Sequence, residues 1–94
     1  AMLLEVLEAS SLRIKPKCKH FDTCGGCKWQ FLPYDEQLKV KEQQVKDAVE
    51  RLGNLSQDLV KGIIPYAEPW YYRNKMELSF GPGPEGTAML GFYP

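Results

Sequence analysis

All three cysteines of the chain lie within one short segment, which reads CKHFDTCGGC and runs from Cys18 through Cys24 to Cys27. A short loop that brings three thiolates together is typical of a zinc site or an iron–sulfur cluster. The pair Gly25-Gly26 favours this interpretation, because a loop around a metal needs a backbone with positive φ angles and close approach, which only glycine supplies at low cost. The segment therefore predicts a loop built around a metal or cluster site. The rest of the chain must hold this loop in place.

The residues alone leave the chemistry of this loop open. Three cysteines could also be one disulfide with a spare thiol, or three buried apolar residues, although the odd count and the charged neighbours argue against both. A tetrahedral zinc or a [4Fe–4S] cluster needs a fourth ligand, and the chain has no fourth cysteine. Its single histidine, His20, could complete a Cys3His zinc site, or it could be an ordinary exposed side chain.

The charge is balanced overall but not along the chain. The formal net charge of zero argues against a general polyanion-binding protein. Residues 10–29 nevertheless contain five basic residues against Asp22 alone, and the aromatic residues Phe21 and Trp29 lie among them. This pattern is found in nucleic-acid contacts and also in plain solvated loops. The basic residues are Arg13, Lys15, Lys17, Lys19 and Lys28.

The length of 94 residues suits one small domain with a modest core. No apolar run approaches the ~20 residues of a membrane span, and no signal-peptide pattern opens the chain, so no membrane partner is expected. Clustered, unpaired cysteines fit a reducing compartment, and we therefore expect a cytoplasmic location.

The pattern predicts one long helix from about residue 33 to residue 52. Pro33 suits a first helical turn, and Asp35 and Glu36 favour the positive end of the helix dipole. Gly53 is expected to supply a left-handed cap. Apolar residues recur at helical spacing on one face, namely Tyr34, Leu38, Val45, Ala48, Val49 and Leu52.

The clearest strand signal lies near the end of the chain. From Tyr72 to Phe80, apolar and polar residues alternate, which predicts one buried and one wet face. A turn-rich stretch at 81–86 then leads into a return strand, so a β-hairpin is expected at about 72–80 and 87–93. A further strand is expected at residues 2–8, and a short strand is possible at 60–64. The predicted fold class is α+β: one helix, one hairpin, the cysteine-rich loop and an N-terminal strand.

These residues resemble a known family, the RNA (uracil-C5)-methyltransferases, which make 5-methyluridine in ribosomal or transfer RNA. The first block of resemblance is that family's iron–sulfur segment, and the second is the segment that follows it. Residues 2–16 resemble the last strand of the family's N-terminal RNA-binding β-barrel. The first block consists of Cys18-x5-Cys24-Gly25-Gly26-Cys27 with Gln30, Tyr34, Gln37, Leu38 and Lys41, and the second of Tyr72 to Gly81 with Leu90, Gly91 and Phe92.

The resemblance implies a fragment of an S-adenosylmethionine-dependent RNA methyltransferase. Residues 1–15 would end the β-barrel domain, and residues 16–94 would form an iron–sulfur central domain, cut before the fourth cysteine and before the methyltransferase domain. That missing domain would bind S-adenosylmethionine and supply every catalytic residue, so no catalytic residue is assigned here. Cut strand edges predict self-association.

The resemblance also implies roles for particular side chains. Cys18, Cys24 and Cys27 would be cluster ligands, with a role in structure or RNA folding rather than redox chemistry. Arg73 and Lys75 would meet phosphate of a structured rRNA or tRNA. Weaker RNA-binding candidates beside the loop are Lys17, Lys19 and Lys28.

Two other readings stay open. The chain could be a stand-alone zinc module that uses Cys18, His20, Cys24 and Cys27 and recognises RNA or protein. A ferredoxin-like electron carrier is disfavoured, because three cysteines leave little room for its cluster chemistry. With the fourth cysteine absent, we expect the fragment to hold a cluster poorly, and to be apo, zinc-loaded or completed by another chain.

Overall fold

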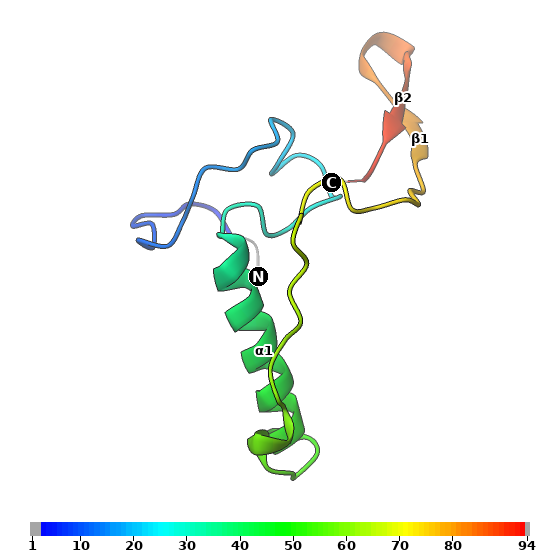
Figure 1. Ribbon diagram of the computed structural model, residues 1–94. Helices are drawn as coiled ribbons and strands as arrows, with labels where there is room; N and C mark the ends of the chain where they lie inside the picture. Colours follow the sequence, from blue (N-terminus) through cyan, green and yellow to red (C-terminus); the bar gives the residue numbers. More distant parts are fainter. Residues whose placement is uncertain (1–2, 94) are drawn as a thin grey trace.

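A computed structural model describes residues 3–93, and its elements follow one another along a single open path (Figure 1). The α-helix α1 (Tyr34–Arg51) is followed by a short 3-10 helix, η1 (Gln57–Leu59). The strands β1 (Ser79–Pro82) and β2 (Ala88–Gly91) flank a second 3-10 turn, η2 (Pro84–Gly86). The strands form a two-stranded antiparallel sheet, so the predicted α+β class is confirmed.

The molecule is extended and has no core within residues 3–93. Its radius of gyration is 17.7 Å, whereas a compact chain of this length would have about 12 Å. None of the described residues is buried, and large apolar side chains such as Leu52 and Ile64 are 85% and 95% exposed. The expected modest core is therefore wrong for this chain. One helix and one hairpin do not supply two layers that can cover each other's apolar faces.

Helix α1 agrees with its predicted range to within a residue at each end. Pro33 precedes it with φ −55°, and Asp35 and Glu36 lie in the first turn, as expected. The cap differs from the prediction. The left-handed residue is Asn54, with φ 52°, rather than Gly53. Gly53 is needed for another reason, because a Cβ there would lie 2.6 Å from the carbonyl oxygen of Val49.

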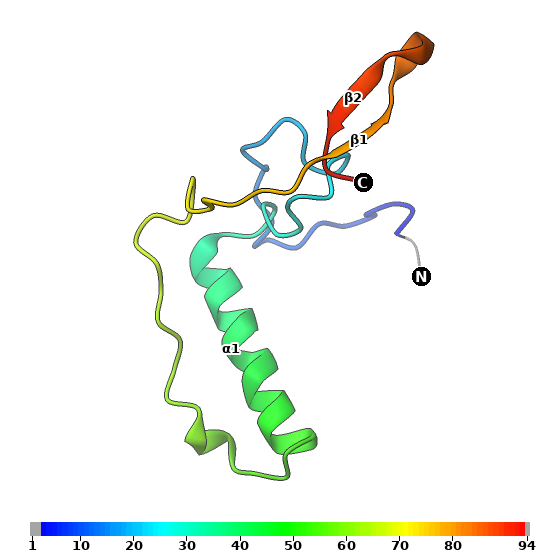
Figure 2. The same ribbon diagram turned by 90° about the vertical axis from the view of Figure 1, so that its right-hand side faces the viewer.

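The connector after α1 runs back alongside the helix, as Figures 1 and 2 show. The side chain of Gln57 donates to Glu50 at the bottom of the helix, and the backbone N–H of Tyr66 donates to the Tyr34 hydroxyl at the top, at 2.8 Å. Residues 60–64 are not a strand, contrary to expectation. They lie against a helix, which offers no backbone ladder for a strand to pair with.

The predicted hairpin is confirmed, but its strands are shorter than expected. Ser79 pairs with Gly91, and Pro82 with Ala88. The pairing stops at Ser79 and Gly91, and residues 72–78 are assigned to no strand. The apolar face that was expected to be buried is open, with Tyr72 67% and Phe80 75% exposed.

The expected N-terminal strand does not form within the described residues. Met2 lies outside them, and residues 3–8 are assigned to no strand. Leu4 and Leu7 are 86% and 90% exposed, so no neighbouring strand covers this segment. A lone strand has no backbone partner in water, which explains the result. The proposed domain boundary near residue 15 stays a prediction.

Candidate metal-ligand loop and nucleic-acid interface

The cysteine loop is held against the start of α1 by hydrogen bonds from two glutamines. Gln30 accepts the backbone N–H of Cys18 on its Oε1 atom at 3.0 Å. Gln37, in the first turns of α1, donates its amide to the carbonyl oxygens of Trp29 and Leu32 at 2.9 and 2.8 Å. The segment before the loop is also fixed, since the N–H of Ile14 donates to the Phe31 carbonyl at 2.8 Å. Gln37 thus ties the end of the loop to the helix, and Gln30 ties the start of the loop to its end.

Within the loop, backbone turns fold the chain around His20. The N–H of Cys24 and the hydroxyl of Thr23 both donate to the His20 carbonyl, at 2.9 and 3.1 Å. The turn passes through Asp22 in a left-handed conformation, with φ 78°. Aspartate tolerates this conformation better than most residues do. The left-handed turn at Asp22 was not predicted from the sequence, although the aspartate side chain was a usable signal.

The three cysteines are free thiols, so no disulfide is present among the described residues. Cys24 is half-buried, whereas Cys18 and Cys27 are exposed. The Cys24 Sγ accepts the backbone N–H of Gly26 at 3.4 Å. Cys24 and Cys27 open onto the same hollow, which is also lined by Phe21, Asp22, Lys28 and Phe31.

This arrangement brings together only part of the proposed ligand set. Cys18 and His20 do not line the hollow of Cys24 and Cys27. Across residues 3–93, no group of three histidine, cysteine, aspartate or glutamate side chains is placed to hold a metal ion. Two thiols at one hollow, one of them accepting a backbone N–H, suit a soft metal or a cluster. The loop as folded here therefore does not fit a complete site, and Cys18 would have to move to join it.

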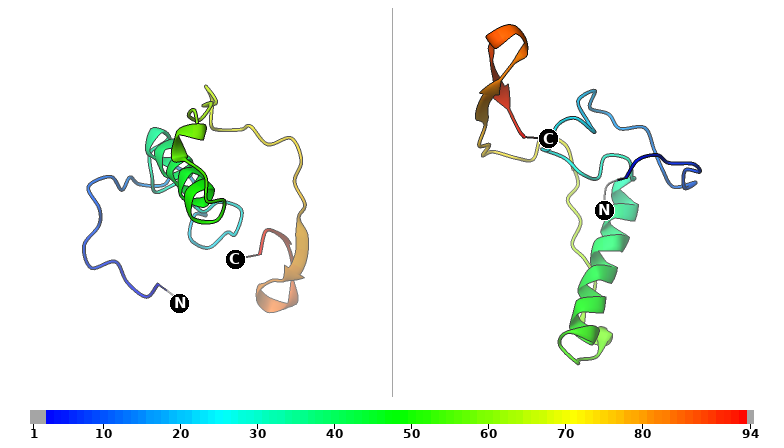
Figure 3. Two further views of the ribbon diagram at one scale, coloured as in Figure 1. Left: turned by 90° about the horizontal axis from the view of Figure 1, so that it is seen from below. Right: turned by 180° about the vertical axis from the view of Figure 1, so that it is seen from behind.

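Gly26 serves close packing rather than an unusual backbone angle. Among the described glycines, positive φ angles occur at Gly62 and Gly86, so the expectation of a positive φ at Gly25 or Gly26 is wrong. Close approach is confirmed at Gly26, where a Cβ would lie 3.0 Å from the ring of Phe92. Figure 3 shows the C-terminal segment returning to the loop in both views. The sequence did not predict this contact of Phe92.

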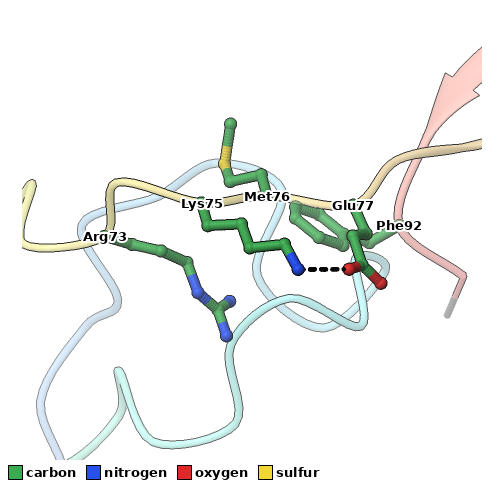
Figure 4. A pocket seen from close by; sticks show the side chains of 5 residues that line it. All are labelled: Arg73, Lys75, Met76, Glu77 and Phe92. Atoms are coloured by element: carbon green, nitrogen blue, oxygen red, sulfur yellow. Dashed lines mark ion pairs between the residues drawn. The ribbon is translucent and has the colours of Figure 1, made fainter.

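Arg73 and Lys75 line a second hollow together with Met76, Glu77 and Phe92 (Figure 4). Lys75 forms an ion pair with Glu77 at 2.8 Å, and both side chains are more than four-fifths exposed. An exposed pair of this kind contributes little to stability. The guanidinium of Arg73 has no ion-pair partner within residues 3–93, and the ion pair drawn in Figure 4 joins only Lys75 and Glu77. Of the two side chains, Arg73 is therefore the one whose charge no carboxylate of the described residues neutralises, and it is the better candidate for binding a phosphate.

Several other basic side chains lie over aromatic rings. The Lys17 ammonium is 4.8 Å from the ring centre of Trp70 and 5.4 Å from that of Tyr71. Arg13 lies 4.9 Å from the Phe31 ring centre. Lys28 lines the cysteine hollow, and Lys19 is exposed. The basic candidates are therefore spread over the loop and the connector and do not form one patch. No helix in the described part of the chain is long and apolar enough to cross a membrane.

Comparison with known proteins finds relatives along nearly the whole chain. The chain is 42% identical over 91 residues to an uncharacterized RNA methyltransferase of Halalkalibacterium halodurans, which is 97% of this chain and 20% of that protein. It is 41% identical over 91 residues to one of Thermosynechococcus vestitus, with the same coverage. A third, from Porphyromonas gingivalis, is 45% identical over 78 residues, or 83% of this chain and 17% of the relative.

The chain spans about a fifth of the length of the curated relatives it matches. No protein-family model matches it, and no solved structure does. The likeness therefore concerns one segment of these proteins, and it covers both the cysteine loop and the hairpin.

Proposed function

We propose that this chain, which is related to one segment of the RNA methyltransferases, is the RNA-contacting cysteine-loop segment of an S-adenosylmethionine-dependent uridine-C5 methyltransferase. The observation that carries the proposal is the 42% identity over 97% of the chain. The uridine-C5 specificity rests on the motif resemblance of the two sequence blocks. The methyl donor and the catalytic groups would belong to other parts of the parent protein, so the chain alone is expected to be inactive.

The proposed RNA contact uses separate basic side chains on a neutral protein. Arg73 is the strongest candidate, because no acidic group pairs with it in the described chain and a guanidinium binds phosphate in a two-pronged geometry. Lys75 is partly neutralised by Glu77, which weakens its claim. The substrate would be a structured rRNA or tRNA. The remaining contacts would come from Lys17, Lys19 and Lys28.

We propose that Cys18, Cys24 and Cys27 ligate a [4Fe–4S] cluster in the parent protein, with a fourth ligand from elsewhere. Support comes from the shared hollow of Cys24 and Cys27 and from the N–H that Gly26 directs at the Cys24 sulfur. Hydrogen bonds to ligand sulfur are a usual feature of such sites. The cluster would stabilise the loop. Cysteines that must stay unoxidised to bind it would require a reducing compartment such as the cytoplasm.

A test of the RNA contact is fluorescence anisotropy with a labelled structured RNA at several salt concentrations. Binding should weaken as salt rises, and Arg73→Gln should weaken it and reduce the salt slope by about one. Lys61→Gln, a basic-to-neutral change away from the loop and the hairpin, is the matched control. An absence of salt-sensitive RNA binding would overturn the proposed function.

A test of the ligand roles is iron, sulfide and zinc analysis on protein purified without oxygen. Iron with equal sulfide and visible absorbance, both lost in Cys24→Ala, would support the cluster. Zinc at one per chain, lost in both Cys24→Ala and His20→Ala, would instead support the Cys3His module. The chain alone is expected to hold a cluster poorly, so the same analysis is made on a longer parent protein that contains this segment. If that protein also stays free of metal after reconstitution with either ion, a ligand role for this loop is contradicted.

A further inference from the structure

A cluster of one cation and two aromatic rings joins the cysteine loop to the end of the connector. Lys17 directly precedes Cys18, and its ammonium lies within 6 Å of the ring centres of both Trp70 and Tyr71. These distances are in the range of favourable cation–π contacts. The cluster thus places a positive charge beside two aromatic rings, and of its three residues only the lysine was a binding candidate from the sequence.

Tyr71 has an unusual conformation that the rest of the fold does not explain. Its φ of 56° is in the left-handed region, which a bulky side chain rarely adopts. Its side chain is 91% exposed, so the strained backbone does not serve to bury the ring. Strain at an exposed aromatic residue is a reason to look for a ligand. With the ring open to solvent, one face is available for stacking.

The surroundings favour a nucleic acid over a peptide as the occupant. Residues 10–29 carry a local excess of positive charge, and Arg73, two residues after Tyr71, has no ion-pair partner within residues 3–93. Unpaired bases stack on aromatic rings while neighbouring cations meet the phosphates. A base-paired helix would offer phosphates but no free base faces.

We propose that Lys17, Trp70 and Tyr71 form a stacking platform for an unpaired nucleotide of single-stranded RNA. This rests on the proposed function, since it specifies how the same chain contacts RNA. Tyr71 stacks on the base, Trp70 forms the adjoining apolar wall, and Lys17 meets the flanking phosphate. The RNA segment recognised would be a loop or an opened strand rather than a duplex.

The test uses the intrinsic fluorescence of Trp70. The chain has two tryptophans, so a Trp29→Phe background leaves Trp70 as the single reporter. A short single-stranded oligouridylate is titrated in, with an RNA duplex of equal length as the comparison. We expect the single strand to quench Trp70 and to bind more tightly than the duplex. Tyr71→Ala should weaken binding about tenfold, whereas Tyr71→Phe should keep it.

A matched control separates the platform from a general effect of aromatic residues. Tyr93 is also exposed, at 70%, and it is the last residue that the structure describes. Tyr93→Ala should leave the affinity unchanged, and circular dichroism should show the same helix content in all variants. If the single strand binds but Tyr71→Ala binds equally well and Trp70 is not quenched, the platform is overturned while the RNA contact stands. If neither RNA binds, the proposed function fails as well.

Discussion

The residue that most directly joins the helix to the cysteine loop is Gln37. One amide nitrogen donates to two carbonyl oxygens, those of Trp29 and Leu32, in a half-buried position. Without that donor, both carbonyl groups lose their partner while staying partly shielded from water. The loss of such a bond has a larger effect than the loss of an exposed one.

Gln37→Ala should therefore destabilise the loop by about 1–2 kcal/mol. Hydrogen exchange at the amides of residues 29–32 should accelerate, because the loop end is no longer tied to α1. The control is Gln43→Ala on the same helix, since the Gln43 side chain bonds only the exposed Asp47. Equal exchange rates in both variants would show that Gln37 does not hold the loop.

At the residue scale, the sequence predicted which positions need a particular residue type better than it predicted the contacts that cause the need. It marked Gly26 and Gly53, and a Cβ at either position would crowd a neighbour: the Phe92 ring at Gly26 and the Val49 carbonyl at Gly53. The close approach at Gly26 was expected, but its partner was not, and the positive φ expected at Gly53 lies at Asn54. Such contacts depend on where a distant or helical neighbour lies, which local patterns do not encode. The grouping of Cys24 and Cys27 without Cys18 has the same origin.

At the scale of elements, the end of α1 offers a test of the cap. The N–H of Asn54 donates to the Glu50 carbonyl, and the N–H of Leu55 donates to that of Val49. Gly53→Ala should cost about 1–3 kcal/mol, because its Cβ would push against the Val49 carbonyl. Asn54→Gly should be neutral or slightly stabilising, because glycine adopts a φ of 52° without strain.

Thermal unfolding followed by circular dichroism at the helix signal distinguishes the two variants. If Asn54→Gly proved the more damaging change, the side chain of Asn54, rather than its backbone angle, would be what ends the helix.

The elements themselves were predictable where the signal is local. Helical spacing of apolar residues predicted α1, and the breaker-rich turn predicted the hairpin. No strand forms at residues 3–8, 60–64 or 72–78, where strands were expected, and the reason is common to all three. An apolar, extended segment becomes a strand only when a second backbone pairs with it, and pairing depends on segments far along the chain. Alternation predicts a face but not the partner that covers it.

For the whole molecule, the lack of a core among residues 3–93 agrees with the finding that the chain matches only a short part of its relatives. The described surface leaves apolar side chains open on α1, on the connector and on the extended segment before β1. The chain matches about a fifth of each relative's length. Apolar faces of this extent are stable in water only when another surface covers them. Either other parts of a parent protein or a second copy could do so.

The second copy gives a prediction for the isolated chain. Residues 72–78 are extended and unpaired, and Met76 and Leu78 on their apolar face are 61% and 43% exposed. Unpaired extended edges pair with one another. The apparent mass from light scattering should therefore rise with protein concentration. Leu78→Lys should lower that mass, because it places a charge on the apolar face, whereas Ser79→Lys adds the same charge on the opposite face and should have less effect. A strictly monomeric chain at high concentration would mean that these edges stay solvated, and would leave the faces of α1 and the connector as the surfaces that need a cover.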